Sequence, residues 1–203
     1  MSFKISRPQF IVFSAFLIAG MFVVALPYFS NPHRINSNNR QPALVPAALA
    51  GSKEKFDYLS NQTSSYCSLQ PTSIEGYADS DFLQGACCSA MDLHRYQEQV
   101  EYLKRYADIP QIPADPYDIS TELAKELLAY QEKITLTEEQ QATYDQAVEL
   151  SDEKGPCCCQ CWRWHAFEGQ AKYLIIELEW SADQVAELWD FEDGCGGPGH
   201  GHT

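Results

Sequence analysis

Apolar residues recur with a helical period through most of the chain after residue 90. Tyr96, Val100 and Leu103 are spaced by four and three residues, a spacing that places them on one face of an α-helix. Two further segments follow the same rule, with stripes formed by Phe167, Ala171 and Leu174, and by Ile119, Leu123, Leu127, Tyr130 and Ile134. The pattern therefore predicts at least three amphipathic helices.

Capping signals predict where two more helices begin. Thr137-Glu138-Glu139-Gln140 and Ser181-Ala182-Asp183-Gln184 both have the form of a capping box, in which side chain and backbone cap each other. The first box should open a helix through Val148, and the second a helix that carries Val185, Leu188 and Trp189. No long segment alternates with the period of a strand. We therefore expect an all-α fold, a small bundle of about five helices over residues 56–195.

A motif occurs twice, 71 positions apart. Each copy has two adjacent cysteines, a histidine after five intervening residues, and then an apolar stripe. The copies consist of Cys87, Cys88, His94, Tyr96, Gln99, Tyr102 and Leu103, and of Cys158, Cys159, His165, Phe167, Gln170, Tyr173 and Leu174. We expect these two duplicated Cys-Cys/His helices at the centre of the bundle, where a pseudo-twofold axis could relate them.

The N-terminus has the pattern of a membrane segment. Residues 10–29 contain no charged side chain and follow Lys4 and Arg7, and about 20 apolar residues can cross a bilayer. We predict a signal-anchor helix at 1–30, with a cleavable signal peptide as the alternative. A flexible linker (31–55) and a glycine- and histidine-rich tail (196–203) flank the domain. The protein would then lie in the cell membrane as a single-pass protein with an extracytoplasmic C-terminal domain, or be secreted if the segment is cleaved.

The charge of the chain limits its partners. The formal net charge is -14, from 14 basic and 28 acidic residues. Nucleic-acid binding rests on neutralising phosphates with Lys and Arg, so this composition argues against a nucleic-acid partner. Docking to anionic lipid is disfavoured for the same reason. Metal cations are the partners that the sequence favours, and it identifies no protein partner.

Eight cysteines first suggest disulfides in an exported protein. Four of them are crowded into residues 157–161, where neighbouring cysteines fit disulfide geometry poorly. Cys67 and Cys195 stand apart from the others and are the better candidates for a plain structural bridge.

The crowded cysteines also have the spacing of metal ligands. If one helix includes them, Cys158, Cys161 and His165 share a face, and Cys87, Met91 and His94 do the same. Pro156 fits a first helical turn, where the helix dipole would lower the pKa of the cysteines that follow. Thiolates and imidazoles suit soft or borderline ions such as copper or zinc. The predicted metal ligands are Cys87, Cys88, His94, Cys157, Cys158, Cys159, Cys161 and His165.

The segment Pro156-Cys157-Cys158-Cys159-Gln160-Cys161 resembles the hexapeptide of the PCYCGC-motif proteins, exported or membrane-attached bacterial proteins of unestablished function. The proline and three cysteines match, Cys158 replaces the tyrosine, and Gln160 replaces the glycine. His165 follows at a distance similar to that of the family's histidine. Family members are often lipid-anchored through a cysteine, and this chain has no early cysteine. The resemblance implies metal or thiol chemistry outside the cytoplasm.

Three functions are consistent with these features. The leading hypothesis is a membrane-tethered protein that binds copper or zinc for sequestration, delivery or sensing, and it makes the protein a binder rather than an enzyme. The second is a thiol–disulfide redox protein that uses Cys158 and Cys161, although the βαβ context of thioredoxin-like folds is missing. The third is a disulfide-braced interaction domain without chemistry. No Ser/His/Asp pattern indicates a hydrolase.

Overall fold

The structure, a computed structural model, describes residues 49–198. The predicted membrane segment, most of the predicted linker and the end of the tail lie outside these residues. Within residues 49–198, none of the helices combines the length and the hydropathy that crossing a bilayer requires.

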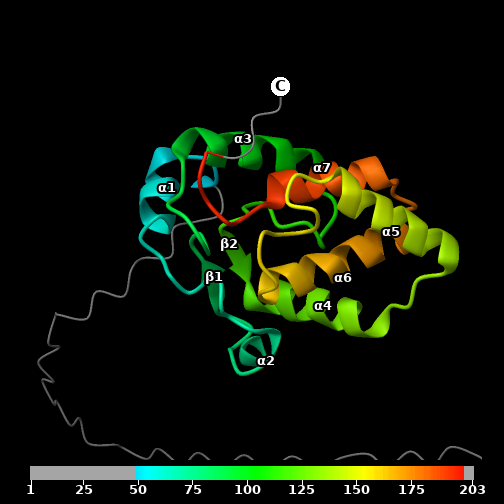
Figure 1. Cartoon of the computed structure of the whole chain (residues 1–203). Helices are drawn as coiled ribbons and strands as arrows, with labels where there is room; N and C mark the ends of the chain where they lie inside the picture. Colours follow the sequence, from blue (N-terminus) through cyan, green and yellow to red (C-terminus); the bar gives the residue numbers. More distant parts are fainter. Residues whose placement is uncertain (1–48, 199–203) are drawn as a thin grey trace, which may run out of the picture. The chain divides into compact units, whose positions relative to one another are not determined.

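The described residues are mostly helical, as predicted, with seven α-helices in place of about five (Figure 1). In chain order the elements are α1 (Lys53–Leu59), α2 (Pro71–Ile74), β1 (Phe82–Gln84), α3 (Leu93–Leu103), the 3-10 turn η2 (Lys104–Tyr106), β2 (Asp118–Ser120), α4 (Thr121–Lys133), α5 (Glu138–Leu150), α6 (Trp162–Glu177) and α7 (Ala182–Glu192). The sheet was not expected from the sequence. Strands β1 and β2 pair antiparallel over three residues each, which is too short for an alternating pattern to be visible.

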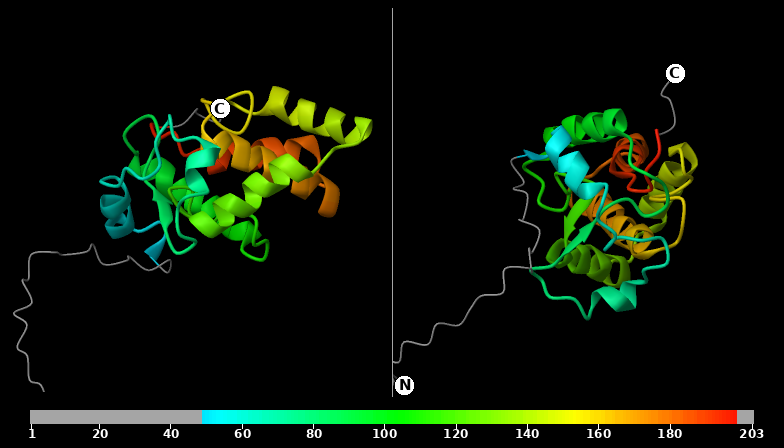
Figure 2. Two further views of the ribbon diagram at one scale, coloured as in Figure 1. Left: turned by 90° about the horizontal axis from the view of Figure 1, so that it is seen from below. Right: turned by 90° about the vertical axis from the view of Figure 1, so that its left-hand side faces the viewer.

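The helices pack as two main pairs, α4 on α6 and α5 on α7 (Figures 1 and 2). Gly169 lets α6 approach α4 closely, because a Cβ atom at this position would lie 2.0 Å from the backbone oxygen of Leu127. Helix α3 packs on α1 and α7, whereas α6 packs on α4, α5 and α7. The two duplicated helices therefore do not form the central pair that we expected.

The apolar stripes of both duplicated helices are nevertheless buried. Tyr96 and Phe167 are both fully buried, and so are Gln99 and Gln170. Phe167 lies in the larger core cluster with α4 and α7, while Tyr96 belongs to a smaller cluster beside α1. The stripe predicted core positions correctly without predicting which core each helix joins.

Both predicted capping boxes are confirmed. The side chains of Thr137 and Ser181 cap α5 and α7, and Gln140 and Gln184 accept hydrogen bonds from the cap backbones in return. Helix α5 continues past Val148 to Leu150.

The predicted starts of the two cysteine-bearing helices are wrong. Helix α3 begins at Leu93 because the Asp92 side chain caps it by accepting from the backbone N–H of Arg95. Helix α6 begins at Trp162, after Cys161 in an extended conformation. Both cysteine pairs thus lie in loops before the helices, so neither Cys87 with His94 nor Cys158 with His165 shares a helical face. Pro156 likewise lies outside α6.

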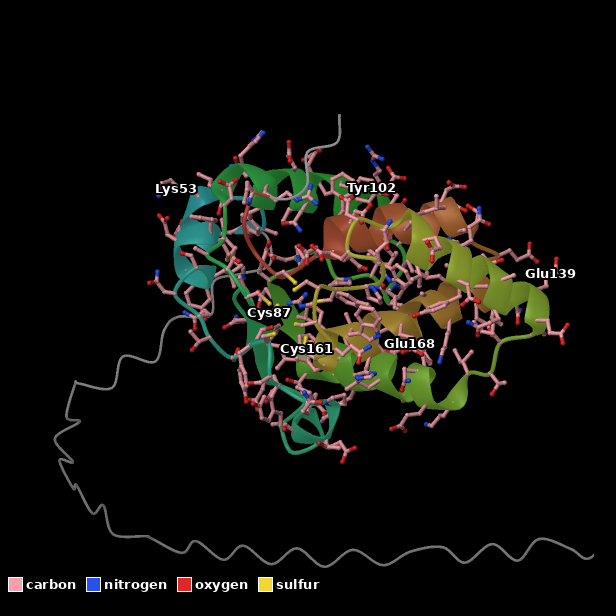
Figure 3. All side chains as sticks on the ribbon, viewed as in Figure 1. Lys53, Cys87, Tyr102, Glu139, Cys161 and Glu168 are labelled. Carbon is pink, nitrogen blue, oxygen red and sulfur yellow. The ribbon has the colours of Figure 1, made fainter. Side chains whose placement is uncertain are left out.

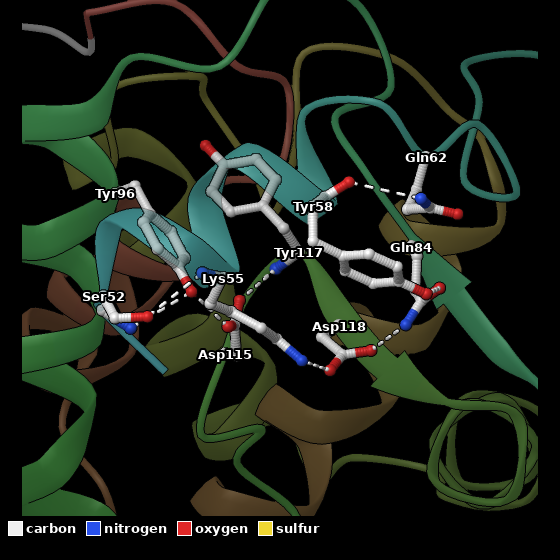
Figure 4. A network of polar contacts seen from close by, with 10 residues as sticks. Ser52, Lys55, Tyr58, Gln62, Gln84, Tyr96, Asp115, Tyr117 and Asp118 are labelled. Carbon is white, nitrogen blue, oxygen red and sulfur yellow. Dashed lines mark hydrogen bonds and ion pairs between the residues drawn. The ribbon is translucent and has the colours of Figure 1, made fainter. Parts of the chain in front are cut away.

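Residues 53–55 of the predicted linker belong to the fold. The Lys55 side chain is buried and forms an ion pair with Asp118 of β2. Gln84 of β1 donates to the other oxygen of Asp118 at 2.7 Å and accepts from the Tyr58 hydroxyl at 3.0 Å (Figure 4). This polar network fixes α1 against the sheet.

The C-terminal segment packs as far as residue 197, so the fold includes the first two residues of the predicted glycine- and histidine-rich tail. The Gly197 N–H donates to the Ala90 oxygen at 2.8 Å, and Gly197 forms an isolated bridge with Met91. Gly196 has φ +83°, and a Cβ there would lie 2.3 Å from the Ser89 oxygen. Glycine therefore permits the close approach of this segment to the loop that carries Cys87 and Cys88.

Candidate metal centre

The eight cysteines converge from four segments that are far apart in the sequence. Cys67 lies between α1 and α2, and Cys87 and Cys88 lie between β1 and α3. Residues 157–161 contribute four cysteines from the loop between α5 and α6, and Cys195 follows α7. All eight are free thiols. Figure 3 shows yellow sulfur atoms gathered around the labelled Cys87 and Cys161.

Backbone hydrogen bonds hold these segments together. The Cys67 N–H donates to the Cys87 oxygen at 3.2 Å, and the Cys87 N–H donates to the Gly194 oxygen at 3.0 Å. The Cys88 N–H donates to the Cys195 oxygen at 3.2 Å. The thiols are thus positioned by a bonded framework of loops, in which two of the segments bond directly to the β1–α3 loop.

Four of the thiols form an inner thiol group, consisting of Cys87, Cys157, Cys161 and Cys195. Cys157 and Cys161 are completely buried, and Cys195 is buried as well. The sulfur of Cys195 lies 3.2 Å from that of Cys157 and 3.7 Å from that of Cys87. The thiol of Cys161 interacts with those of Cys157 and Cys87.

The other four form an outer thiol group, consisting of Cys67, Cys88, Cys158 and Cys159. Three of its members are exposed, and Cys159 is half-buried. The Cys88 sulfur lies 3.5 Å from the Cys158 sulfur and 3.9 Å from the Cys159 sulfur. The Cys159 sulfur in turn lies 2.9 Å from the Cys67 sulfur.

The two groups touch each other at two places. The Cys158 and Cys195 sulfurs are 2.9 Å apart, and the Cys87 and Cys88 sulfurs are 3.4 Å apart. The eight thiols therefore form one continuous cluster, buried at one end and open to solvent at the other. A surface hollow lies at the open end, lined by Cys88, Ser89, Glu153, Cys158, Asp193, Cys195, Gly196, Gly197 and Pro198.

The longer of these sulfur separations, from 3.4 to 3.9 Å, are compatible with metal ligation, whereas the 2.9 Å contacts are shorter than a metal site requires. A tetrahedral ion with metal–sulfur bonds of about 2.3 Å sets its sulfurs about 3.8 Å apart. Four sets of three cysteines have all their sulfurs within 4.8 Å of one another. A donor set made only of thiols suits copper(I), zinc or other soft ions, and is unsuited to calcium or magnesium.

Hydrogen bonds among the thiols decide which of them ionise first. Thiol hydrogen bonds, foremost those from Cys161 and Cys195, hold the pKa of Cys157 far below its ordinary value. Burial opposes ionisation of Cys88, but hydrogen bonds from neighbouring thiols, that of Cys87 first, bring its pKa below the ordinary value. Each thiol group therefore contains one thiol whose ionisation is favoured by hydrogen bonds from its neighbours.

A buried cation lies beside the inner thiol group. Arg163 in the first turn of α6 is fully buried, and its guanidinium carbon would lie only 2.3 Å from a Cβ atom at Gly194. One Nη donates to the Pro116 oxygen at 2.7 Å, whereas Nε and the other Nη have no hydrogen-bond partner. Burial opposes the charge, but the four inner thiols, when ionised, offset this effect and raise the pKa of Arg163. Among residues 49–198 no carboxylate forms an ion pair with Arg163, although its charge also acts on the buried carboxyl groups of Glu192 and Asp193.

Comparisons with protein-family models, curated proteins and solved structures find no match. The resemblance of residues 156–161 to the PCYCGC motif therefore stays a prediction.

The six cysteines predicted as ligands come together, and the two histidines do not join them. His94 is exposed and lies 3.1 Å from Glu98, its neighbour one turn along α3. His165 is half-buried on α6, and every candidate ligand group in the described part of the chain consists of cysteines alone. Met91 packs against the smaller core cluster. Helices α3 and α6 begin only after the cysteines, so each histidine lies on a helix while the cysteines before it lie in a loop. The histidines therefore do not share a helical face with the cysteines.

Sequence reasoning missed three residues of the centre. Cys67 and Cys195 were expected to bridge each other, but the structure places Cys67 against Cys159 and Cys195 against Cys157 and Cys158. The glycines around Cys195 were a usable signal, because they permit a close approach as readily as they permit disorder. Nothing in the sequence distinguished Arg163 from a surface arginine.

Proposed function

We propose that this protein binds soft or borderline metal ions, copper(I) or zinc, through its cysteine cluster. The observation that supports this best is the convergence of all eight cysteines, from segments as distant as Cys67 and Cys195, into one set of free thiols. A buried cation beside the inner group favours the thiolate form that metals require. The role would be sequestration, delivery or sensing rather than catalysis.

We further propose that this domain is held at the extracytoplasmic face of a membrane. The support is the apolar run at residues 10–29 and the resemblance of residues 156–161 to exported proteins. Fractionation of cells that express the full chain, with protease added outside, tests the placement. A protein protected from external protease in intact spheroplasts would contradict it.

Metal loading of the purified full chain tests the binding function. The protein is purified without oxygen in detergent, stripped of metal, and titrated with zinc or copper(I) against a competing chelator. Metal–thiolate absorption should rise to a sharp end point. Cys157→Ser with Cys161→Ser should weaken binding, because both side chains belong to the buried inner group. Ser68→Ala with Ser89→Ala, next to cysteines in the sequence, is the matched control.

A redox function is the second candidate, and the two shortest sulfur separations favour it. Cys67 with Cys159, and Cys158 with Cys195, each lie at 2.9 Å, close enough for oxidation to disulfides after a small movement. The predicted pair, Cys158 and Cys161, is not one of these. Turnover of a small disulfide substrate that is lost on Cys158→Ser would favour this function over metal binding.

A further inference from the structure

We propose that the cluster holds more than one metal ion, joined by bridging thiolates, with a buried inner ion and an exchangeable outer ion. This inference rests on the proposed metal-binding function and adds the number of ions and the route by which they enter and leave.

The first argument is the sharing of thiols between candidate sites. The four sets of three are Cys67, Cys88 and Cys159; Cys87, Cys157 and Cys195; Cys88, Cys158 and Cys195; and Cys157, Cys158 and Cys159. Most members belong to two sets. One tetrahedral ion can use only four sulfurs. If neighbouring sets each hold an ion, the shared sulfur must bind both ions, which is the definition of a bridging thiolate.

The second argument is the difference in exposure along the cluster. Cys157 and Cys161 are completely buried, so an ion held there has no direct path to solvent. Cys67, Cys88 and Cys158 are exposed, and the hollow beside Cys88 and Cys158 opens at their end. The hollow, which Cys195 of the inner thiol group also lines, therefore gives an ion a route from solvent past the outer thiols to the inner ones.

The contacts between the groups provide that route. A sulfur of one group lies against a sulfur of the other at the Cys158–Cys195 contact of 2.9 Å and at the Cys87–Cys88 contact of 3.4 Å. An ion can exchange one thiolate ligand for the next across these contacts without becoming fully hydrated. Glu153 and Asp193 line the hollow, so carboxyl groups lie where an ion would enter.

Cadmium is a suitable probe because it binds thiolates as zinc does and can be followed by NMR. Metal-free full chain in detergent is titrated with cadmium under nitrogen, and the bound ions are counted by native mass spectrometry. At least two ions per chain are expected, with cadmium resonances coupled through a shared sulfur. A chelator should remove them in two phases, the outer ion first.

Paired variants assign the ions to the two groups. Cys67→Ser with Cys159→Ser removes two outer thiols and should lose one ion and the fast phase of removal, while the slow phase remains. Cys157→Ser with Cys161→Ser should instead lose the slow phase. The wild-type count and the cadmium coupling need no variant, so they test the inference even if a variant fails to fold.

The outcomes separate this inference from the proposed function. A single ion per wild-type chain, retained unchanged by Cys67→Ser with Cys159→Ser, overturns the inference and leaves metal binding intact. Several ions without cadmium–cadmium coupling overturn the bridging. A wild-type chain that binds no cadmium, zinc or copper(I) overturns the proposed function itself.

Discussion

Glu192, the last residue of α7, should make the stability of the fold depend on pH. Its side chain is completely buried; one oxygen accepts from the Gln170 amide at 2.7 Å and the other has no partner. Burial raises the pKa of this carboxyl from 4.5 to about 8, against the opposing effects of the Gln170 hydrogen bond and of Arg163. The folded protein therefore keeps a proton on Glu192 at neutral pH.

The size of the effect follows from linkage. Between pH 4.5 and about 8 the unfolded chain releases this proton and the folded chain retains it, so the folded state is destabilised as pH rises. Each pKa unit corresponds to about 1.4 kcal/mol, which gives a loss of about 5 kcal/mol over the whole window. The stabilisation from protonated Glu192 is fully present below pH 4.5, the pKa of this carboxyl in the unfolded chain. It is lost once the pH reaches about 8, the pKa of the same group in the folded protein.

The variant Glu192→Gln removes the titration and keeps the shape of the side chain. The free energy of unfolding of the metal-free, reduced full chain is measured in urea for variant and wild type. The variant's value minus the wild-type value should increase by about 3–4 kcal/mol as the pH rises from roughly 5 to 8. Taking the difference cancels the titration of the thiols, which both proteins share. Glu187→Gln, an exposed position on the same helix, controls for loss of a carboxylate. A difference between Glu192→Gln and wild type that stays constant with pH would refute the reasoning.

Three further predictions concern other parts of the fold. Gly169→Ala should destabilise the protein by about 1–3 kcal/mol in urea unfolding, because the new methyl group would lie 2.0 Å from a backbone oxygen of α4. Gly76→Ala is the control and should not destabilise the protein, since the nearest oxygen there is at 3.7 Å. Equal effects of the two substitutions would contradict the close packing of α6 on α4. Thr137→Ala should cost about 1 kcal/mol through loss of the α5 cap, and an unchanged midpoint would argue against the cap. His94→Ala with His165→Ala should leave the metal content by elemental analysis unchanged, and a fall would return the histidines to the site.

Local rules predicted the helical part of the fold well. The stripe at Tyr96 and Leu103 marked buried positions, and the boxes at Thr137 and Ser181 marked helix starts. These signals depend on residues within one or two turns of each other, and such interactions act independently of the rest of the chain. The sheet of β1 and β2 escaped detection because its pairing joins strands of three residues across a long separation.

The candidate site was predicted in composition but not in geometry. The sequence identified the crowded cysteines as possible metal ligands, yet it placed them on helices. The cap at Asp92 and the extended Cys161 start the helices later, and that shift separates the histidines from the thiols. The position of Cys195 depends on tertiary contacts, namely the pairing of its segment with the loop of Cys88. No periodicity or spacing in the sequence records such a contact.

The most direct test of the account is the state of the eight thiols in the full chain purified without oxygen from cells. The account predicts bound copper or zinc by elemental analysis, and thiols that resist alkylation until a chelator removes the metal, after which all eight react. A protein that contains no metal and shows its cysteines joined in disulfides by mass spectrometry without reduction would contradict it.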